Sequence, residues 1–564
     1  MQRSGAQLII DFLEQRGVRV VAGMPGGANL PLYDALHGSR IQHVLVRHEQ
    51  AAGFIAQGMA RVTGRAGVCF ATSGPGATNL VTPLADARMD SVPVVAITGQ
   101  VPTALLGTDA FQEVDTVSVF RPVVKDVAMV RHIEELWPAL ERAFELAESG
   151  RPGPVLLDVP KDIQQARIAA PTAASLPPSA AAEPLSDELI ERAVGLLRSA
   201  ERPVLYLGGG ISRAAAHELV AQLARREQLP VVCSLMGLGA FDPAHPLFCG
   251  MLGMHAAPYT NMLLHECDLL LAIGVRFDDR ATGKLSEFCP RARTIHVDID
   301  AREIGKLRRV DVGIVSDASA FMRAFLPRTR ETARPEWLAR VNELRKQNPL
   351  PEPAPRDDTM HPLAILRALG ECLAPDTPVT TDVGQHQMWV AQALPIRSPR
   401  QLLTSGGLGS MGFGLPAAIG AALASGGRAI CVTGDGSLAL NIHELATLAE
   451  LDLDVVIVLF DNRHLGLVRQ QQTLFYGQRL HACAFERHTD FLTVARGFGV
   501  EACEWQPGTD SVNALHQLMR QRGPRLIRVP LMAAEMVLPM VPPGAGNCEM
   551  LGISAGNSPE IGRL

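Results

Sequence analysis

Short, continuously apolar runs rich in Val, Ile and Leu alternate with longer helical patterns along most of the chain. Such runs predict strands, and strands that are apolar on both faces and separated by helices indicate parallel sheets covered on both sides. The runs that carry this pattern are 43–49, 66–74, 92–100, 203–210, 229–235, 267–275, 294–300, 378–384, 428–436 and 453–462. The pattern predicts an α/β fold made of doubly wound parallel-sheet domains.

Two stretches, 169–186 and 348–358, interrupt this alternation, since they are rich in Pro and in small or charged residues. They divide the chain into thirds. A chain of 564 residues is also too long for a single hydrophobic core and is expected to form about three. We therefore expect domains at 1–168, 186–347 and 359–530, followed by a C-terminal tail at 531–564.

The composition narrows the class of protein. The formal net charge is −6 and the charged residues are interspersed, so we expect no nucleic acid and no anionic lipid as partner. The ten cysteines stand singly, without a CxxC pair, and we expect them to be small buried side chains in a reducing compartment. Neither a leader peptide nor an apolar run of roughly 20 residues is present, which favours the cytoplasm of a bacterium and no membrane.

The most informative segment is 428–462, where a buried strand ends in Gly434-Asp435-Gly436-Ser437 and the next strand ends in Asp461-Asn462. Side chains at the ends of neighbouring parallel strands can reach one hard cation, and Mg²⁺ prefers such oxygen ligands shared with phosphates. The glycines let the backbone approach a diphosphate, and the following helix N-terminus favours negative charge. A Gly-Asp-Gly run is also typical of a plain turn, but the strand-end Asn462 favours a metal site.

This spacing resembles the signature of thiamine-diphosphate enzymes, in which GDG is followed by Asn-Asn. The first Asn is Asp461 here. Because the family's side-chain ligand is the second Asn, matched by Asn462, the difference leaves metal binding intact. The resemblance also implies that the backbone carbonyl of His464 is the third protein ligand.

Glu49 is the candidate for activating that coenzyme. The apolar strand 43–47 runs into His48-Glu49-Gln50 and then into a helix of small residues, 51–61. Thiamine diphosphate needs a carboxylic acid against its aminopyrimidine ring, which shares a proton with a ring nitrogen and so promotes loss of the thiazolium proton. A glutamate at a helix start is more often only a favourable contact with the helix dipole. The place of Glu49 in the larger pattern favours the catalytic interpretation.

Over nearly its full length the chain resembles the catalytic subunits of the acetohydroxyacid synthase (acetolactate synthase) family, closest to the bacterial valine-sensitive type. The motifs that carry the resemblance occur in the family's order: MPGGANLPLYDAL, RHEQAAGFIAQGMAR, SGPGATNLVT, GTDAFQEVD, SGRPGPVLLDVPKD, GMLGMH, GVRFDDR, HVDID, TDVGQHQMW, SGGLGSMGFGLPAAIGA, GDGS and PMVPPGA. The resemblance implies a pyrimidine-binding domain first, a central FAD-binding domain and a diphosphate-binding domain last. It also implies active sites between two subunits, in a homodimer or a dimer of dimers.

The resemblance assigns further roles. Gly409 and Met411 contact the aminopyrimidine, with Met411 as the apolar wedge that bends the coenzyme. The other coenzyme-binding candidates are Gly384, Gln385, His386, Gly434, Asp435, Gly436, Ser437 and Asn462. The substrate channel is lined by Gly27, Phe111, Gln112, Lys161, Met254, Arg280 and Gln471. Arg280 is the candidate clamp for a carboxylate, because a planar guanidinium can bind it through two parallel hydrogen bonds. Taken singly, such side chains are more often surface charges or core residues.

FAD is also implied by the resemblance, as a coenzyme that the family requires without using it in the reaction. The positions that match the family's flavin site are Arg151, Gly208, Gly209, Gly210, His255, Arg276, Asp279, Asp298 and Asp300. The glycine run after the strand is by itself a weak dinucleotide signal, because the spaced GxGxxG fingerprint is absent.

The implied reaction is decarboxylation of pyruvate and transfer of the two-carbon unit to a second pyruvate, giving 2-acetolactate, or to 2-oxobutyrate, giving 2-aceto-2-hydroxybutyrate. It is the first common step in the synthesis of valine, leucine and isoleucine. Gln471 stands where many family members carry a tryptophan that grips the ethyl group of 2-oxobutyrate, which predicts a weak preference for that acceptor. A separate small regulatory subunit is expected, with valine as the effector.

Other functions fit the sequence less well. Pyruvate oxidase and a flavin-free catabolic acetolactate synthase are disfavoured by the segments 250–255, 276–280 and 539–545, and glyoxylate carboligase by Glu49. A hydride-transferring flavin dehydrogenase would account for the middle third alone. A non-catalytic regulatory homologue is disfavoured because Glu49, Asp435 and Asn462 are all present.

Overall fold

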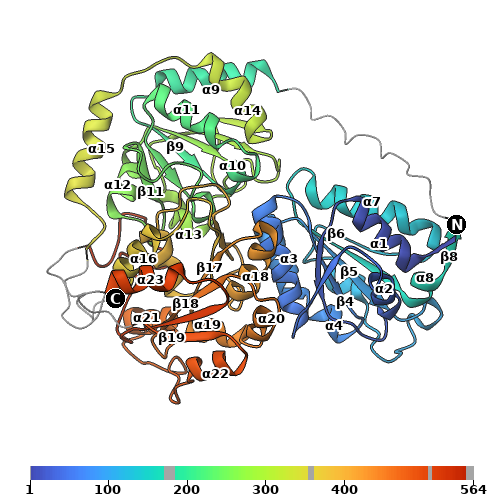
Figure 1. Ribbon diagram of the computed structural model, residues 1–564. Helices are drawn as coiled ribbons and strands as arrows, with labels where there is room; N and C mark the ends of the chain where they lie inside the picture. The colour runs from blue at the N-terminus through green and yellow to red at the C-terminus, as the bar shows by residue number, and fades with distance from the viewer. Residues whose placement is uncertain (1, 170–184, 353–360, 506–510, 554–564) are drawn as a thin grey trace.

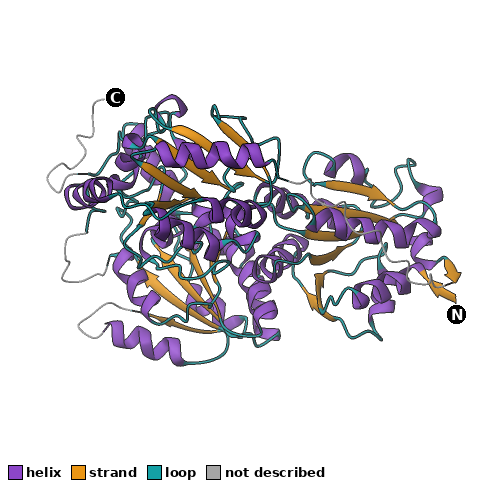
Figure 2. Ribbon diagram, turned by 90° about the horizontal axis from the view of Figure 1, so that it is seen from above, coloured by secondary structure: helices purple, strands orange, loops and turns teal. Residues whose placement is uncertain are grey.

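The protein consists of three six-stranded sheets that follow one another along the chain, each covered by helices (Figure 1). The structure is a computed structural model that describes residues 2–169, 185–352, 361–505 and 511–553. Every pairing within the three sheets is parallel. The view from above shows the helices on both faces of the strands (Figure 2). The prediction of three α/β domains with parallel sheets is confirmed. Most of linker 169–186, residues 353–358 of the second linker and the last part of the tail lie outside the described residues.

The N-terminal domain has the strand order β3-β2-β4-β5-β7-β6. Its strands are β2 (Val20–Gly23), β3 (Gln42–Leu45), β4 (Gly67–Ala71), β5 (Val94–Gln100), β6 (Asp126–Met129) and β7 (Pro154–Pro160). Its helices are α1 (Gly5–Gln15), α2 (Leu30–Leu36), α3 (Glu49–Thr63), α4 (Pro75–Thr78), α5 (Val81–Met89), α6 (Thr116–Phe120), α7 (Leu136–Glu148) and α8 (Lys161–Gln165). A separate antiparallel pair, β1 (Gln2–Ser4) with β8 (Arg167–Ala169), joins the beginning of this domain to its end.

The middle domain has the strand order β11-β10-β9-β12-β13-β14. Its strands are β9 (Pro203–Leu207), β10 (Val231–Cys233), β11 (Phe248–Met251), β12 (Leu269–Ile273), β13 (Arg293–Asp298) and β14 (Val312–Val315). Its helices are α9 (Asp187–Ser199), α10 (Gly209–Arg213), α11 (His217–Glu227), α12 (Pro258–Glu266), α13 (Asp279–Thr282), α14 (Ala318–Phe325) and α15 (Pro335–Gln347). In this order the chain runs outward in both directions from β9 and β12, and ligands of such sheets bind in the crevice between those two strands.

The C-terminal domain repeats the strand order of the N-terminal one, as β16-β15-β17-β18-β20-β19. Its strands are β15 (Val379–Thr381), β16 (Leu402–Thr404), β17 (Ala429–Gly434), β18 (Val455–Asp461), β19 (Glu501–Glu504) and β20 (Arg525–Pro530). Its helices are α16 (Pro362–Glu371), α17 (Gln385–Ala393), α18 (Gly414–Ser425), α19 (Asp435–Leu438), α20 (Glu444–Glu450), α21 (Gly466–Phe475), α22 (Phe491–Gly497) and α23 (Ser511–Arg520).

The apolar runs indicated neither the inner strands β2, β7 and β20 nor the edge strands β6, β11, β14, β16 and β19. The edge strands have only three or four residues each. An edge strand has one neighbour and a short strand buries few side chains, so little apolar sequence is needed to form it. The prediction for 43–49 was also too long, because β3 ends at Leu45 and the chain then turns into α3.

Helices α3 and α18 join the N-terminal and C-terminal domains and lie side by side in Figure 1. Glycines make this close approach possible. A Cβ atom on Gly58 would collide with the carbonyl of Ala417, and one on Gly420 would collide with the carbonyl of Ile55. The two helix backbones therefore touch, and one apolar core runs through both domains.

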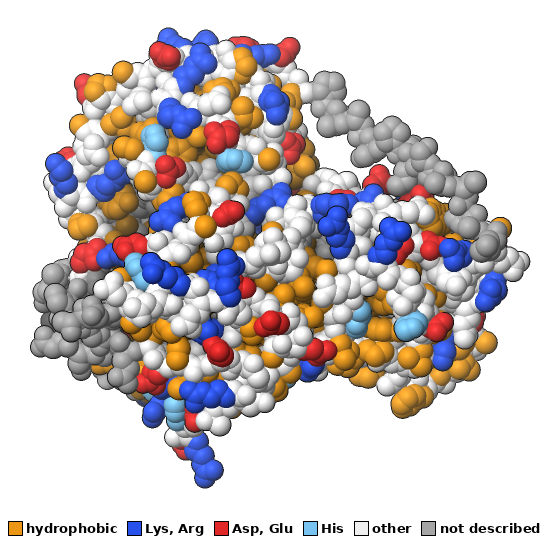
Figure 3. All heavy atoms as spheres, viewed as in Figure 1, with side chains coloured by type: hydrophobic (Ala, Val, Ile, Leu, Met, Phe, Trp, Pro, Cys, Tyr) orange, Lys and Arg blue, Asp and Glu red, His pale blue; other side chains and the backbone are white. Residues whose placement is uncertain are grey.

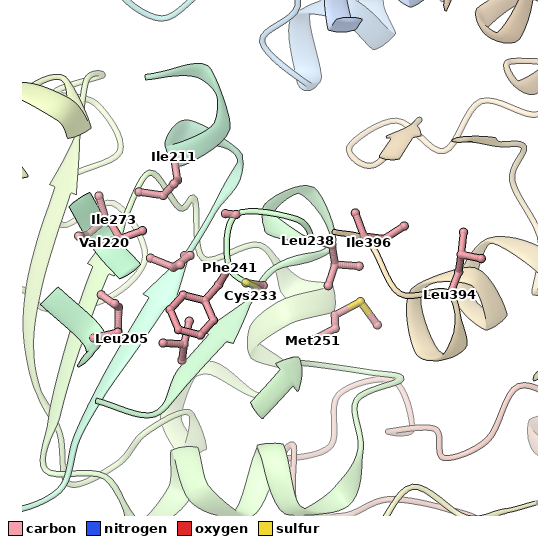
Figure 4. Packing of buried hydrophobic residues seen from close by; sticks show 14 of the residues in the cluster. Leu205, Ile211, Val220, Cys233, Leu238, Phe241, Met251, Ile273, Leu394 and Ile396 are labelled. Atoms are coloured by element: carbon pink, nitrogen blue, oxygen red, sulfur yellow. The ribbon is translucent and has the colours of Figure 1, made fainter. Parts of the chain in front are cut away.

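A second core continues from the middle domain into the C-terminal one. Figure 4 shows Leu238 and Met251 of the middle domain lying towards Ile396 of the C-terminal domain, while Leu205, Phe241 and Ile273 pack within the sheet. All ten cysteines are free. Seven are buried as expected, Cys372 and Cys503 are partly buried, and Cys548 is exposed, which corrects the prediction for that residue. No helix among the described residues is long and apolar enough to cross a membrane.

Candidate active site

A cavity of about 200 Å³ lies at the carboxyl ends of β15, β17 and β18. The structure brings together here most of the residues that the sequence assigned to the coenzyme and its metal ion. They are Gly384, Gln385, His386, Met411, Gly434, Asp435, Gly436, Ser437, Asn462 and His464. The cavity sits where the strand order of the sheet reverses, which is the usual place for a ligand in such a sheet.

Asp435 follows β17 directly and is buried. β17 and β18 pair in parallel with Gly434 opposite Phe460, so Asp435 and Asp461 leave the sheet side by side. The Asp435 carboxylate accepts a hydrogen bond from the backbone N–H of Gly436 at 2.9 Å. Burial, and then the negative charge of Asp461, raise the pKa of Asp435. A cation beside this carboxylate would offset both effects, so the site fits the expected metal ion.

Asn462 and His464 form the other side of the metal site. The Asn462 Oδ1 accepts the backbone N–H of His464 at 2.9 Å, and the Asn462 Nδ2 donates to Gln385 Oε1 at 3.1 Å. These bonds hold the amide oxygen and the His464 backbone on the cavity wall. No group of three or more His, Cys, Asp or Glu side chains placed to hold a metal occurs in the described ranges. The predicted ligand set contains only one such side chain, Asp435.

His386 supplies a polar atom that fits a phosphate. It lies in the first turn of α17, and burial lowers the pKa of its imidazole to about 3, so the ring is neutral. Its Nε2 is buried and has no hydrogen-bond partner among the described residues. Since a buried polar atom without a partner is costly, this nitrogen is suited to a ligand atom in the cavity. Gly384 precedes it with a φ of 156°, and a Cβ there would lie 2.7 Å from the His386 ring.

The loop 405–413 carries the two residues expected against the aminopyrimidine ring. Asp382 fixes its second half, because its carboxylate accepts the backbone N–H of Gly412 at 2.8 Å and that of Gly414 at 3.1 Å. Met411 lines the smaller cavity and Gly409 lines a larger neighbouring one. Both cavities share Val383 and Leu467 in their walls, so they adjoin.

The larger cavity, of about 700 Å³, lies at the carboxyl ends of the middle-domain strands. It contains most of the residues predicted for FAD: Arg151, Gly209, Gly210, His255, Arg276, Asp279 and Asp298. Gly208 and Asp300 are absent from its lining but adjoin it. A Cβ on Gly208 would collide with the carbonyl of Gly274, and Asp300 accepts a hydrogen bond from Arg151 at 3.3 Å.

Several features of this cavity suit a dinucleotide. Its size is that of a cofactor site. The glycines after β9 let a ligand approach the backbone at the point where the strand order reverses. The Tyr206 hydroxyl on its wall is buried without a partner among the described residues. Burial lowers the pKa of His255 to about 4 and raises that of Asp298 to about 6.

The substrate-channel candidates separate into two groups. Met254, Arg280 and Gln471 line the larger cavity, and the Arg280 guanidinium lies 3.9 Å from the Met254 sulfur. The four candidates in the N-terminal domain, which are Gly27, Phe111, Gln112 and Lys161, line neither cavity, and neither does Glu49. A single chain therefore does not bring the two groups together.

Glu49 begins α3 and is 7% exposed. The Asn79 side chain donates to its Oε2 at 2.9 Å, and a Cβ on Gly76 would lie 3.2 Å from its Oε1. Gly74 belongs to the same turn after β4 as Gly76, and the backbone of Gln112 lies close to it. Phe111, next to Gln112, is 87% exposed.

Two groups of polar residues near the site were not predicted. Asp461 accepts hydrogen bonds from His488 at 2.8 Å and from Arg528 at 2.6 Å. Burial acts to raise the pKa of Asp461, but these two bonds outweigh it, so the pKa is lowered. The other group surrounds Asp90, where the three domains meet. The departure of Asp461 from the Asn-Asn signature could have indicated the first group, and no sequence signal points to the second.

Comparison with known proteins finds relatives that match nearly the whole chain. Residues 3–119 match the N-terminal TPP binding domain of thiamine pyrophosphate enzymes, residues 190–325 the central domain, and residues 382–529 the C-terminal TPP binding domain. The chain is 51% identical to the acetolactate synthase isozyme 1 large subunit of Escherichia coli K12, over 97% of this chain and 98% of that one. It is 46% identical to the acetolactate synthase large subunit of Parasynechococcus marenigrum WH8102, over 98% and 91% of the two chains. It is 44% identical to the isozyme 2 large subunit of E. coli K12, over 97% and 99%.

Proposed function

This chain belongs to the family of acetolactate synthase large subunits, which are thiamine pyrophosphate enzymes, and from this premise we propose how its residues act. The protein decarboxylates pyruvate and joins the two-carbon unit to a second pyruvate, which gives 2-acetolactate for the synthesis of branched-chain amino acids. The observation that carries the proposal is the buried cavity at the ends of β15, β17 and β18, where Asp435, Asn462 and His386 converge.

Thiamine diphosphate, when bound, supplies the electron sink that loss of carbon dioxide from a 2-oxo acid requires. The C-terminal domain holds its charged end. The Asp435 carboxylate, the Asn462 amide oxygen and the His464 carbonyl would bind Mg²⁺, and the His386 Nε2 would donate to a phosphate oxygen. Gly434 and Gly436 leave room for the diphosphate beside the backbone. Met411, at the wall of the same cavity, would support the bend of the coenzyme.

Glu49 would face the aminopyrimidine ring and share a proton with it. Since Glu49 and the other N-terminal candidates line neither cavity of their own chain, we propose that they complete the site of a second copy in a homodimer. Exposed apolar side chains of the N-terminal domain support this, among them Leu30, Leu105 and Phe111. Figure 3 shows hydrophobic side chains gathered along the lower edge of this domain. Surfaces of this kind are typical of subunit interfaces.

FAD would occupy the larger cavity, where the acceptor 2-oxo acid would also enter. Arg280 is 66% exposed at its side chain and pairs only loosely with Asp279, at 3.8 Å, so its guanidinium is available for a substrate carboxylate. Pyruvate or 2-oxobutyrate would be the acceptor, with Gln471 beside it. The site would exclude water. Water therefore could not divert the two-carbon unit before the second oxo acid binds.

The relatives named as large subunits support a small regulatory subunit as a partner. We propose valine as its effector. The ten free cysteines support a reducing compartment, which we propose to be the bacterial cytoplasm.

The direct test supplies the purified protein with pyruvate, Mg²⁺, thiamine diphosphate and FAD but no electron acceptor. We expect acetolactate and carbon dioxide in equal amounts, and no product when thiamine diphosphate is omitted. A flavin oxidase or dehydrogenase would need an acceptor to turn over, so absence of acetolactate under these conditions would refute the proposed function.

A further inference from the structure

The segment 86–91, at the end of α5, is the point where all three domains meet. Asp90 and Ser91 lie in the wall of the larger cavity together with Arg213 of the middle domain and Gly406 and Gly407 of the C-terminal domain. Figure 1 shows α3, α10 and α18, one helix from each domain, converging near the centre of the molecule. The segment therefore lies between the expected flavin site and the loop that carries Gly409 and Met411.

The Asp90 side chain holds that loop by its backbone. Its carboxylate is fully buried and accepts the N–H of Gly407 at 2.8 Å and the N–H of Gly406 at 3.0 Å. The same carboxylate pairs with Arg61 of α3 at 2.8 Å. A buried charge kept by three donors is costly to disturb, because removing its charge leaves those donors poorly satisfied.

Asp86 holds the same loop one turn earlier. Its Oδ1 accepts hydrogen bonds from the hydroxyl of Ser405 and, at 3.3 Å, from that of Ser410. Arg61 lies 3.5 Å from its other oxygen, so one guanidinium serves two buried carboxylates. Burial, and then the charge of Asp90, raise the pKa of Asp86. The other oxygen of Asp86 has no hydrogen-bond partner among the described residues, so the cluster keeps a surplus of acceptors even with the N–H and O–H groups of the loop bound to it.

The backbone of the same segment is held from the cavity side. Arg213 donates to the carbonyl oxygens of both Asp90 and Ser91, and Arg151 donates to the Ser91 hydroxyl at 2.9 Å. Ser91 has a φ of 56°, the left-handed conformation that ends α5, and the backbone N–H of Val92 donates back to the carbonyl of Ala87 at 2.7 Å. Arg151 and Arg213, which hold Ser91 from the other side, both line the larger cavity.

We propose that Asp90 is a positioning residue that couples the flavin cavity to the thiamine-binding loop, so that FAD in the cavity tightens the binding of thiamine diphosphate. A flavin packed against Arg151, Ser91 and Arg213 restricts the positions of Asp90, and Asp90 in turn fixes Gly406 and Gly407 two residues before Gly409. By linkage, thiamine diphosphate tightens FAD binding by the same factor. The inference rests on the proposed function, because it takes both coenzymes as ligands of this chain.

The test is a calorimetric titration of thiamine diphosphate with Mg²⁺ into the flavin-free and the FAD-loaded protein. For the unaltered protein we expect the dissociation constant to fall about tenfold when FAD is bound, within the usual range of coupling between sites. Asp90→Asn keeps the size of the side chain but replaces one carboxylate oxygen with an NH₂ group. That group faces the donors from which the carboxylate accepts hydrogen bonds. In this variant we expect the same dissociation constant with and without FAD.

Asp158→Asn is the matched control. Asp158 is also a fully buried aspartate of the N-terminal domain, and it accepts from Thr98 at 2.7 Å and Gln100 at 3.0 Å instead of from the loop. This variant should be less stable and should keep the tenfold ratio. Should Asp90→Asn fail to fold, Ser405→Ala takes its place, since it removes the hydroxyl that joins Asp86 to Ser410, and we expect it to reduce the ratio.

Three results would overturn the proposal: an unaltered protein whose affinity ignores FAD, a loop variant that keeps the full ratio, or a control that loses it. Failure to bind thiamine diphosphate under any condition is a different result, and it would count against the proposed function itself.

Discussion

The N-terminal and C-terminal domains have the same strand order, yet they present different chemistry at the same place in the sheet. In the C-terminal domain, the crevice between β15 and β17 collects buried polar groups suited to a diphosphate and its metal ion. In the N-terminal domain, the turn after β4 lies beside one carboxylate, Glu49, and beside the segment between β5 and α6 that carries the exposed Phe111. Under the proposed function, one topology would serve the charged end of a coenzyme in one domain and its ring in the other.

The two domains also differ in how much of the proposed active site each one forms within a single chain. The cavity of the C-terminal half is lined only by residues after 382, whereas in the N-terminal half Gly27 and Phe111 are exposed and Glu49 is buried away from both cavities. Since α3 and α18 pack with touching backbones, the two domains of one chain have no freedom to close on each other. Two copies of the chain would supply the two halves to each site.

The largest effect should come from Glu49→Gln, which removes the only acid of the N-terminal half that we place in the reaction. Turnover should fall by about 10²–10⁴, the usual contribution of acid–base catalysis, while the fold and the binding of thiamine diphosphate persist. Steady-state rates and calorimetric titration measure the two quantities. The same change at the exposed Glu134 is the control and should leave the rate unaltered. Unchanged turnover in Glu49→Gln would remove this residue from the mechanism.

A mixture of two inactive variants tests whether the halves come from different chains. Asp435→Asn should be inactive because it weakens the metal site, and Glu49→Gln because it lacks the acid. When both are expressed together and assemble at random, about a quarter of the sites should combine an intact half from each chain, and about a quarter of the activity should return. Activity that stays at the level of the separate variants would show that both halves of a site belong to one chain.

A smaller change is expected from Gln471→Trp, on the wall of the larger cavity. The added indole gives an apolar contact to the ethyl group of 2-oxobutyrate, and such a contact is worth about 1–3 kcal/mol. The ratio of acetohydroxybutyrate to acetolactate in a competition assay should rise accordingly. Gln472→Trp places the same ring on a residue that is held by His481 outside the cavity lining, and it should leave the ratio unchanged. An unaltered ratio in Gln471→Trp would place the acceptor elsewhere.

The smallest effect on turnover should come from Asp461→Asn, which restores the Asn-Asn pair of the family signature. Asn462 and its bonds to His464 and Gln385 remain, so the rate should change little. The hydrogen bonds to Arg528 and His488 lose their charge, and the free energy of unfolding should fall by about 1.5–3 kcal/mol. Urea denaturation measures this loss. A stability equal to that of the unaltered protein would mean that Arg528 is satisfied by Glu504 alone.

The C-terminal half was the easier one to predict because its logic is local. Two apolar strands separated by a helix usually lie parallel in one sheet, so the sequence alone places Asp435 and Asn462 at one sheet edge. His386 and Met411 came only from motifs, since nothing in their spacing points to a ligand. Asp90 was out of reach, because its partners Gly406 and Gly407 lie more than three hundred residues away and meet it only through domain packing.

The antiparallel pair of β1 with β8 has a consequence for how the protein is made. Residues 2–4 pair with residues 167–169, so the N-terminal domain can close only after residue 169 has left the ribosome. Chains grow at about 5–20 residues per second and domains fold in order from the N-terminus, so this closure would come well before the last sheet is translated. The domain that carries Glu49 would be folded while the diphosphate-binding domain is still being synthesised.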